Sequence, residues 1–127
     1  MAENEWNMLK KLDHPGIVRL IDIYKDKENF YLVTEFIEGN ELFDEVCKRD
    51  NFSERDAACV LKQILKAVNY CHKRSICHRD IKAENVIIEG SDLQVKLIDF
   101  GLAIQFDPAK GMDRVIGTML YMAPEVV

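Results

Sequence analysis

Several features are missing from this sequence of 127 residues, and each absence narrows its class. It contains no run of about eighteen apolar residues and no apolar core of a signal peptide, so we expect no membrane segment. Basic residues do not predominate, because 17 Lys and Arg stand against 22 Asp and Glu, a net charge of −5. Nucleic acids and anionic membranes require basic surfaces, so we expect neither as a partner. Because membrane and signal segments are missing, we expect a cytoplasmic protein.

Cysteine motifs are also scarce. None of Cys47, Cys59, Cys71 and Cys77 forms a Cys-x-x-Cys pair. The string from Cys71-His72 to Cys77-His78 offers soft metal ligands, but its spacing fits no common zinc finger. Reducing compartments keep thiols free, so we expect neither a zinc site nor a disulfide framework.

What is present is an ordinary globular composition, 48% hydrophobic and 31% charged, with mixed periodicity. Helical spacing occurs at 2–12 and again at 53–72, where Ser53 is a candidate N-cap. Two β-rich runs, 17–24 and 29–36, are close enough to form a hairpin. We therefore predict an α+β fold. The apolar stripe expected to face the core from the second helix is Ala57, Val60, Leu61, Ile64, Leu65, Val68 and Cys71.

A second hairpin is predicted in the middle of the chain. The apolar runs 86–88 and 95–98 are separated by Glu-Gly-Ser-Asp at 89–92, a cluster of turn-forming residues. The open end of this hairpin brings Asn85 and Asp99 together. A carboxamide and a carboxylate are hard oxygen ligands, which suit magnesium.

The loop before this hairpin carries Asp80 and Lys82. Phosphoryl transfer needs metal-bridged phosphates, a cation near the moving group and a carboxylate that accepts the proton of the attacking hydroxyl. The set of Asp80, Lys82, Asn85 and Asp99 contains these chemical types.

Three motifs in order resemble those of eukaryotic protein kinases. HRDIKAEN at 78–85 resembles the catalytic loop, Asp-Phe-Gly at 99–101 the metal-binding tripeptide, and Ala-Pro-Glu at 123–125 the end of the activation segment. Lysine two residues after the loop aspartate is typical of serine/threonine kinases. The resemblance implies that Asp80 is the base and that Lys82 contacts phosphate, and it predicts that Thr118 hydrogen-bonds both side chains.

The resemblance also implies a partial two-lobed fold. It places 1–36 at the end of the small β-rich lobe, 37–40 in the hinge, and 41–127 at the start of the helical large lobe through the activation segment. Kinase domains are about twice this length, so we expect an incomplete domain. Gly39 is expected to be a flexible joint in the hinge.

ATP and Mg²⁺ are the implied cofactors. Thr34 aligns with the gatekeeper, Glu35 and Ile37 with the backbone that hydrogen-bonds adenine, and Glu5 with the partner of a small-lobe lysine. Judged locally, Glu5 also fits a solvated surface residue. The other residues assigned to the cofactor site are Glu41, Glu84, Asn85, Ile87, Ile98 and Asp99, with Asn85 and Asp99 as the magnesium ligands.

Among these, Glu41 and Glu84 align with carboxylates that contact basic substrate residues, so we expect protein substrates with Arg or Lys near the target hydroxyl. A helix-start glutamate that complements the helix dipole is an equally compatible reading of Glu41. The runs 39–85 and 114–127 resemble calcium-dependent and calmodulin-regulated kinases, although Ala83 replaces their usual proline. No Asp-x-Asp-x-Asp-Gly loop occurs, so a calcium-sensing region would lie outside these residues.

Three functions remain compatible with the sequence. The first is a serine/threonine protein kinase, of which this chain alone is expected to be inactive because it has no glycine-rich loop and no small-lobe lysine. The second is a non-catalytic pseudokinase or scaffold, which the same absence would fit. The third is an adaptor whose acidic groove binds basic peptides without ATP. A glycine-rich loop and a Val-Ala-x-Lys-like strand upstream in the same reading frame would favour the first.

Overall fold

The computed structural model describes residues 2–49 and 52–127. Met1, which begins the predicted small-lobe range, and Asp50 and Asn51 of the kinase-like run lie outside the described residues. The fold is α+β, as predicted. Its helices are α1 (Ala2–Leu9), α2 (Leu42–Lys48) and α3 (Glu54–His72), with short 3-10 turns η1 (Ala83–Asn85), η2 (Met119–Tyr121) and η3 (Pro124–Val126). Its strands are β1 (Leu20–Lys25), β2 (Phe30–Thr34), β3 (Gly39–Glu41), β4 (Ile76–Cys77), β5 (Val86–Glu89), β6 (Gln94–Leu97) and β7 (Ile104–Gln105).

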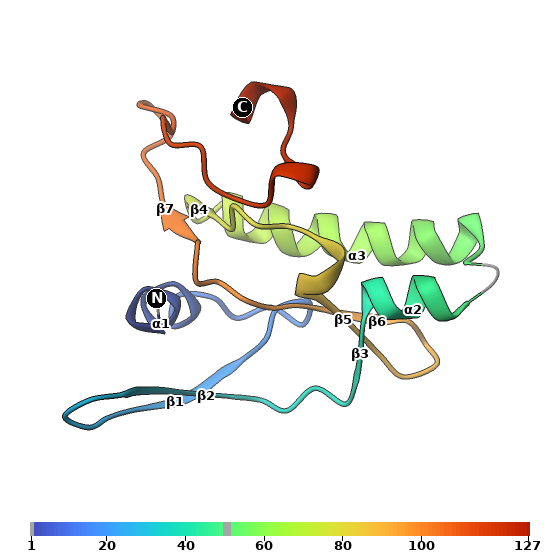
Figure 1. Ribbon diagram of the computed structural model, residues 1–127, viewed down its shortest axis with the longest axis horizontal. Helices are drawn as coiled ribbons and strands as arrows, with labels where there is room; N and C mark the ends of the chain where they lie inside the picture. Colours follow the sequence, from blue (N-terminus) through green and yellow to red (C-terminus); the bar gives the residue numbers. More distant parts are fainter. Residues whose placement is uncertain (1, 50–51) are drawn as a thin grey trace.

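Both predicted hairpins are confirmed. β1 pairs antiparallel with β2, and β5 pairs antiparallel with β6 inside a sheet of order β3-β5-β6. β1 begins at Leu20 rather than at residue 17, because Ile17 forms a parallel bridge to Leu97 of β6 instead. This bridge joins the two hairpins, and Figure 1 shows β1 and β2 extending away from β5 and β6 on the side opposite the C-terminal segment.

The first helix is shorter than predicted. α1 ends at Leu9, and the amides of Lys11 and Leu12 bond carbonyls three residues back, which tightens the chain into a turn before Pro15. Of the apolar residues at helical spacing, Leu9 and Leu12 are buried and Trp6 is half-buried, so the spacing identified part of the packed face, which also includes Met8.

The long helix α3 has the predicted ends. The Ser53 hydroxyl accepts a hydrogen bond from the amide of Asp56 at 3.0 Å, and the helix ends at His72. The predicted stripe is wrong on one side, because Ala57 is exposed and Leu61 and Leu65 are 53% and 57% exposed. The buried positions are Val60, Ile64, Ala67 and Cys71. No helix in the described ranges is both long and apolar enough to cross a membrane.

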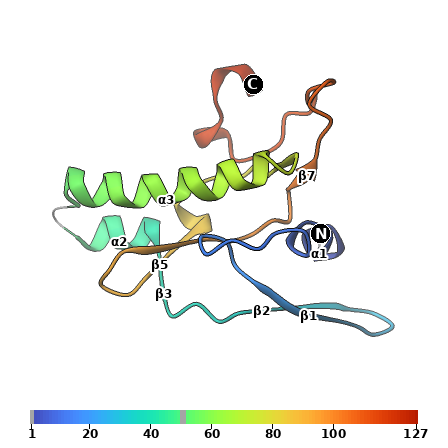
Figure 2. The same ribbon diagram turned by 180° about the vertical axis from the view of Figure 1, so that it is seen from behind.

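A single hydrophobic core connects the elements that carry the site. It runs from Leu9 of α1 through Val60 of α3 to Val86 and Leu97 of the β5–β6 hairpin and ends against Phe100, which is fully buried. Figure 2 shows α3 lying between β5 and the C-terminal segment. The hairpin and the residues just after it are therefore fixed from both the α1 and the α3 sides.

Gly39 has a different role from the one predicted. It lies in β3 opposite Glu89, and a Cβ at this position would be 2.1 Å from the carbonyl oxygen of Ile88. The glycine is required because two backbones approach closely, not because the chain must flex. The segment after Phe100 is mostly irregular, but it contains β7, which pairs with β4.

Candidate active site

The β5–β6 hairpin places Asn85 and Asp99 at its open end. Val86 pairs with Leu97, and the amide of Ile98 donates to the carbonyl of Asn85 at 3.0 Å, so the residues flanking the hairpin stay together. Asn85 is only 6% exposed, whereas Asp99 is exposed. Local strand pairing thus brings together two oxygen-bearing side chains that are fourteen residues apart in the sequence.

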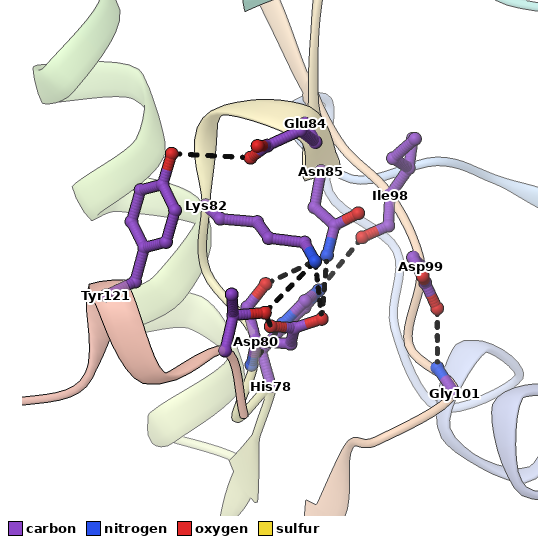
Figure 3. Close-up of polar contacts among 10 residues, drawn as sticks. His78, Asp80, Lys82, Glu84, Asn85, Ile98, Asp99, Gly101 and Tyr121 are labelled. Atoms are coloured by element: carbon purple, nitrogen blue, oxygen red, sulfur yellow. Dashed lines mark hydrogen bonds and ion pairs between the residues drawn. The ribbon is translucent and has the colours of Figure 1, made fainter. Parts of the chain in front are cut away.

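Asp80, Lys82 and Thr118 form one hydrogen-bonded group. The Thr118 hydroxyl donates to Asp80 Oδ1 at 2.6 Å and accepts from Lys82 Nζ at 3.0 Å, which confirms the predicted contacts of Thr118. Lys82 Nζ also lies 3.5 Å from Asp80 Oδ2 as an ion pair. Figure 3 shows the lysine and asparagine side chains converging on the Asp80 carboxylate. A residue far along the chain therefore completes the loop site.

The Asp80 carboxylate is held in its ionised form. Burial tends to raise its pKa, but hydrogen bonds from Thr118, Lys82 and Asn85, together with the lysine charge, lower the pKa overall. The Asn85 amide donates to the backbone carbonyl of Asp80 at 2.9 Å and to its Oδ2 at 3.2 Å. These donors fix the carboxylate without neutralising it, as a proton acceptor requires.

His78 supports this loop, and no role for its imidazole came from the sequence. Its ring is 2% exposed, and the amide of Asp80 donates to Nδ1 at 3.1 Å. Nε2 lies 2.9 Å from the carbonyl of Ile98, so the neutral tautomer with the proton on Nε2 satisfies both contacts. Burial lowers the pKa of His78. The ring thereby ties the loop to the end of β6 without carrying charge.

The Asp99 backbone adopts a left-handed conformation with φ of +57°, and its Oδ1 accepts from the amide of Gly101 at 3.2 Å. The carboxamide of Asn85 uses its nitrogen toward Asp80, which leaves its oxygen for a cation. One carboxylate and one amide oxygen fit magnesium, since this ion commonly takes one or two protein ligands and fills its remaining positions with water and phosphate oxygens. No cluster of three or more His, Cys, Asp or Glu with metal-ligand spacing occurs within residues 2–49 and 52–127.

A cavity of about 300 Å³ lies beside Asp99. It brings together most of the residues that the sequence assigned to the nucleotide, and it is lined by Glu5, Val18, Leu32, Thr34, Glu35, Phe36, Ile37, Ile87, Ile98 and Asp99. Glu41, Glu84 and Asn85 lie outside this lining. Glu41 is the N-cap residue of α2 without a side-chain capping bond, and Glu84 accepts from the Tyr121 hydroxyl at 3.4 Å.

Glu5 reaches the cavity from α1. Its Oε1 accepts from the amide of Phe100 at 3.1 Å, so the side chain is not a purely solvated surface group. Its pKa is raised, chiefly by burial and also by the charge of Asp99, although the hydrogen bond from Phe100 opposes the shift. Glu5 is thus a half-buried carboxylate, and a cation beside it would favour its ionised form.

The backbone of Glu35 and Ile37 is suitably free. Within the described part of the chain, neither the Glu35 carbonyl nor the Ile37 amide takes part in a backbone hydrogen bond. The Glu35 side chain accepts from the amide of Arg19 at 2.9 Å and pairs with Lys96 Nζ at 2.8 Å. Because these contacts engage the carboxylate, we assign it no part in binding a ligand. The pair lowers the pKa of Glu35 despite its partial burial.

Three apolar cavity residues escaped the sequence analysis: Val18, Leu32 and Phe36. The alternation in the run 29–36 predicted a strand but not which of its side chains would face a cavity. Phe36 is 90% exposed, a sign that its ring has little protein to pack against here. Only the tertiary structure reveals these walls, for example through Val18, whose amide donates to the carbonyl of Leu97 in β6.

The activation-like segment touches the loop at Gly117. This residue has φ of +136°, and a Cβ there would lie 2.6 Å from the carbonyl oxygen of Arg79. Glycine is therefore required for the close approach that delivers Thr118 to Asp80. Arg79 itself donates from Nε to the carbonyl of Leu102 at 2.6 Å.

The site combines an ionised carboxylate, a lysine paired with it, two side chains whose oxygens suit a cation, and an adjoining cavity. These are the parts that phosphoryl transfer uses, and covalent catalysis would instead need an activated nucleophile. The fold and site therefore define a phosphotransferase-like α+β protein.

Comparison with known families makes this assignment specific. The family model of the protein kinase domain matches residues 1–127, and the chain belongs to this family. It is 44% identical over 130 residues to a calcium/calmodulin-dependent protein kinase, cmkA, of Emericella nidulans, covering 100% of this chain and 31% of that protein. It is 43% identical to calcium-dependent protein kinase 4 of Plasmodium berghei, covering 97% of this chain and 24% of that protein.

A third relative is calcium-dependent protein kinase 5 of Plasmodium falciparum, 40% identical over 94% of this chain and 22% of that protein. These names agree with the resemblance to calcium-dependent and calmodulin-regulated kinases. The chain spans between about a fifth and a third of the length of the curated relatives it matches.

Proposed function

We propose that this chain is the central part of a serine/threonine kinase domain, and that the whole protein transfers the γ-phosphoryl group of ATP to protein hydroxyls with the help of Mg²⁺. The observation that carries the proposal is the Asp80–Thr118–Lys82 group, with its 2.6 Å and 3.0 Å hydrogen bonds. It joins the loop at 78–85 to the segment before Ala-Pro-Glu, where a protein substrate would be presented. Membership of the protein kinase family supports it.

Asp80 is the proposed base. Its pKa is lowered, and its carboxylate is fixed by Thr118 and Asn85, so the entropic cost of orienting the base is already met by the fold. Lys82 stands 3.5 Å from Asp80 and is the proposed contact to the transferred phosphoryl group. The lysine would balance charge that develops beside the carboxylate during transfer.

Asn85 and Asp99 are the proposed magnesium ligands. When bound, the ion would neutralise phosphate charge and orient the phosphate oxygens. The cavity beside them is the proposed adenosine end of the ATP site. Its apolar walls Ile87 and Ile98 would cover the faces of the base, and the free backbone groups of Glu35 and Ile37 would hydrogen-bond its edge.

The division of the chain is part of the proposal. The β1–β2 hairpin and α1 would belong to the small lobe as residues 1–36, residues 37–40 would be the hinge, and 41–127 would begin the large lobe. In support, the ATP-like cavity is lined by residues from both sides of 37–40. Protein substrates with Arg or Lys near the target hydroxyl fit the exposed Glu41 and the surface carboxylate of Glu84, and calcium sensing would lie outside these residues.

The decisive experiment compares wild type, Asp80→Asn and Asp92→Asn in the full-length protein. Asp92 lies in the exposed turn of the β5–β6 hairpin and is a matched control. Asp80→Asn should lower kcat about 100-fold or more with little change in the KM for ATP, because a carboxamide cannot accept the proton. Asp92→Asn should behave as wild type.

The same assay should use two peptides that differ only in Arg or Glu N-terminal to the target serine. The arginine peptide should have the higher kcat/KM. Wild-type turnover in Asp80→Asn would refute the assigned base, and preference for the glutamate peptide would refute the substrate class. A wild-type protein without phosphoryl transfer would favour a pseudokinase or scaffold.

A further inference from the structure

Helix α1 makes a second long-range contact beyond that of Glu5. The Nδ2 atom of Asn4 donates to the carbonyl oxygens of Gly101 at 3.1 Å and Ala103 at 2.9 Å. The partners are 97 and 99 residues away in the sequence. This contact holds the chain immediately after Asp99, and the site described above gives Asn4 no part.

Both acceptors need a donor. Gly101 is buried and Ala103 is 1% exposed, so water has little access to their backbone. A buried carbonyl without a hydrogen bond is costly. A carboxamide nitrogen has two N–H donors, enough for both carbonyls, whereas an isosteric carboxylate has none. Asparagine is therefore a chemically specific choice at this position.

The contact reaches the magnesium-ligand side chain through one residue, Gly101. The carbonyl of Gly101 accepts from Asn4, while the amide of Gly101 donates to Asp99 Oδ1 at 3.2 Å. The amide of Ala103 closes the turn by bonding the Phe100 carbonyl at 3.1 Å. Asp99 has φ of +57°, a conformation that a non-glycine residue keeps only when its surroundings hold it.

We propose that Asn4 is a positioning residue that acts through Gly101 to set the orientation of the Asp99 carboxylate for magnesium. The inference rests on the proposed function of Asp99. Glu5 and Asn4 both hold this turn. Glu5 accepts from the Phe100 amide, and Asn4 donates to the carbonyls of Gly101 and Ala103. Displacement of α1 would therefore release the turn and the carboxylate together.

The test uses Asn4→Asp and Asn4→Ala in the full-length protein. Asn7→Asp is the matched control, because it makes the same chemical change on the same helix at a side chain without a hydrogen bond to the described residues. If Asn4 affected only the stability of α1, neither variant should lose function. An acid in the first turn complements the helix dipole, and alanine is the best helix former. Loss in both variants, larger in Asn4→Asp, would instead follow from missing donors and from carboxylate–carbonyl repulsion.

Two readouts are needed. In peptide phosphorylation, the Mg²⁺ concentration for half-maximal rate should rise about 5- to 10-fold in Asn4→Asp and about 3-fold in Asn4→Ala, with the peptide KM unchanged, as expected for one or two lost hydrogen bonds. In the metal-free protein, amide hydrogen exchange at 99–103 should become several-fold faster, with the rest of the large lobe unchanged. Asn7→Asp should match wild type in both.

A wild-type magnesium dependence and wild-type exchange in Asn4→Asp would overturn the proposal. So would a variant whose peptide KM, magnesium dependence and exchange throughout the domain all change together, because that pattern marks general destabilisation. If the wild-type protein transfers no phosphate, the proposed function fails, and the exchange comparison still decides whether Asn4 holds the 99–103 turn.

Discussion

At the level of single side chains, the hydroxyl of Thr118 is the contact on which the candidate site depends. It joins Asp80 and Lys82 to the segment before Ala-Pro-Glu, and a threonine can do so because a hydroxyl both donates and accepts. The lowered pKa of Asp80 follows from this arrangement. The balance of burial against hydrogen bonding keeps the carboxylate ready to accept a proton.

His78 gives a prediction for pH at the same scale. Burial lowers the pKa of His78 from its ordinary value of 6.5. Below about pH 6.5, His78 therefore binds a proton more readily in the unfolded chain than in the folded chain. Unfolding is thereby favoured, and the contribution of His78 to stability should fall as the pH drops below 6.5 and stay constant above it. The melting temperature of the full-length protein between pH 7.5 and 5.5 measures this effect.

The variants His78→Gln and His72→Gln separate the sources of this dependence. His72 is exposed at the end of α3, so His72→Gln should keep the wild-type pH dependence, whereas His78→Gln should reduce it. A contribution from His14, whose pKa is lowered mainly by burial, should persist in both. Equal pH dependence in wild type and His78→Gln would contradict the role given to His78.

At the level of elements, α3 and the β5–β6 hairpin support the site as a unit. The Gln63 amide donates to the carbonyl of Leu93 at 2.8 Å and its oxygen accepts from the amide of Val95 at 3.1 Å. Leu93 has φ of +53°, so the helix side chain holds a strained turn. The hairpin register that brings Asn85 and Asp99 together is therefore fixed from outside the sheet.

The start of α3 gives the prediction at this scale. Ser53→Ala removes the side-chain acceptor for the Asp56 amide and should cost about 0.5–2 kcal/mol of unfolding free energy. For a kinase-sized domain, this corresponds to a melting temperature lower by roughly 2–4 °C per kcal/mol. Ser91→Ala, in the exposed hairpin turn, is the control and should melt as wild type. A loss as large in Ser91→Ala would argue against the cap.

At the level of the whole molecule, this chain leaves large apolar side chains in water. Phe36 and Leu120 are 90% and 94% exposed, and Leu61 and Leu65 form an apolar strip along α3. Exposed strips of this kind promote association.

We therefore expect the purified 127-residue chain to self-associate and to have little or no kinase activity. It has no glycine-rich loop over the phosphates and no lysine to pair with Glu5, and this chemistry depends on such positioning groups. Light scattering and a magnesium-dependent peptide assay, with the full-length protein as the positive control, measure both points. Robust phosphorylation by a monodisperse 127-residue chain would disprove this expectation.

The sequence by itself determined the features that depend on neighbours along the chain. Ser53 marked the start of α3, and the turn residues at 89–92 predicted the hairpin that places Asn85 beside Asp99. The order of the motifs gave the family because each motif is a short, contiguous string. Local hydrogen bonds and strand pairing within about fifteen residues suffice for all of these.

Only the tertiary structure decided which surfaces meet. Leu61 and Leu65 carry the same periodic signal as Val60 and Ile64, and only the packing of α3 against the core decides which pair is buried. The hydrogen bonds from Asn4 to Gly101 and Ala103 could not be predicted from the sequence for a similar reason. From the sequence alone, a single polar residue on a short helix is expected to be solvated. Folding brings Asn4 against the buried carbonyl of Gly101, 97 residues away, and this carbonyl needs an N–H donor.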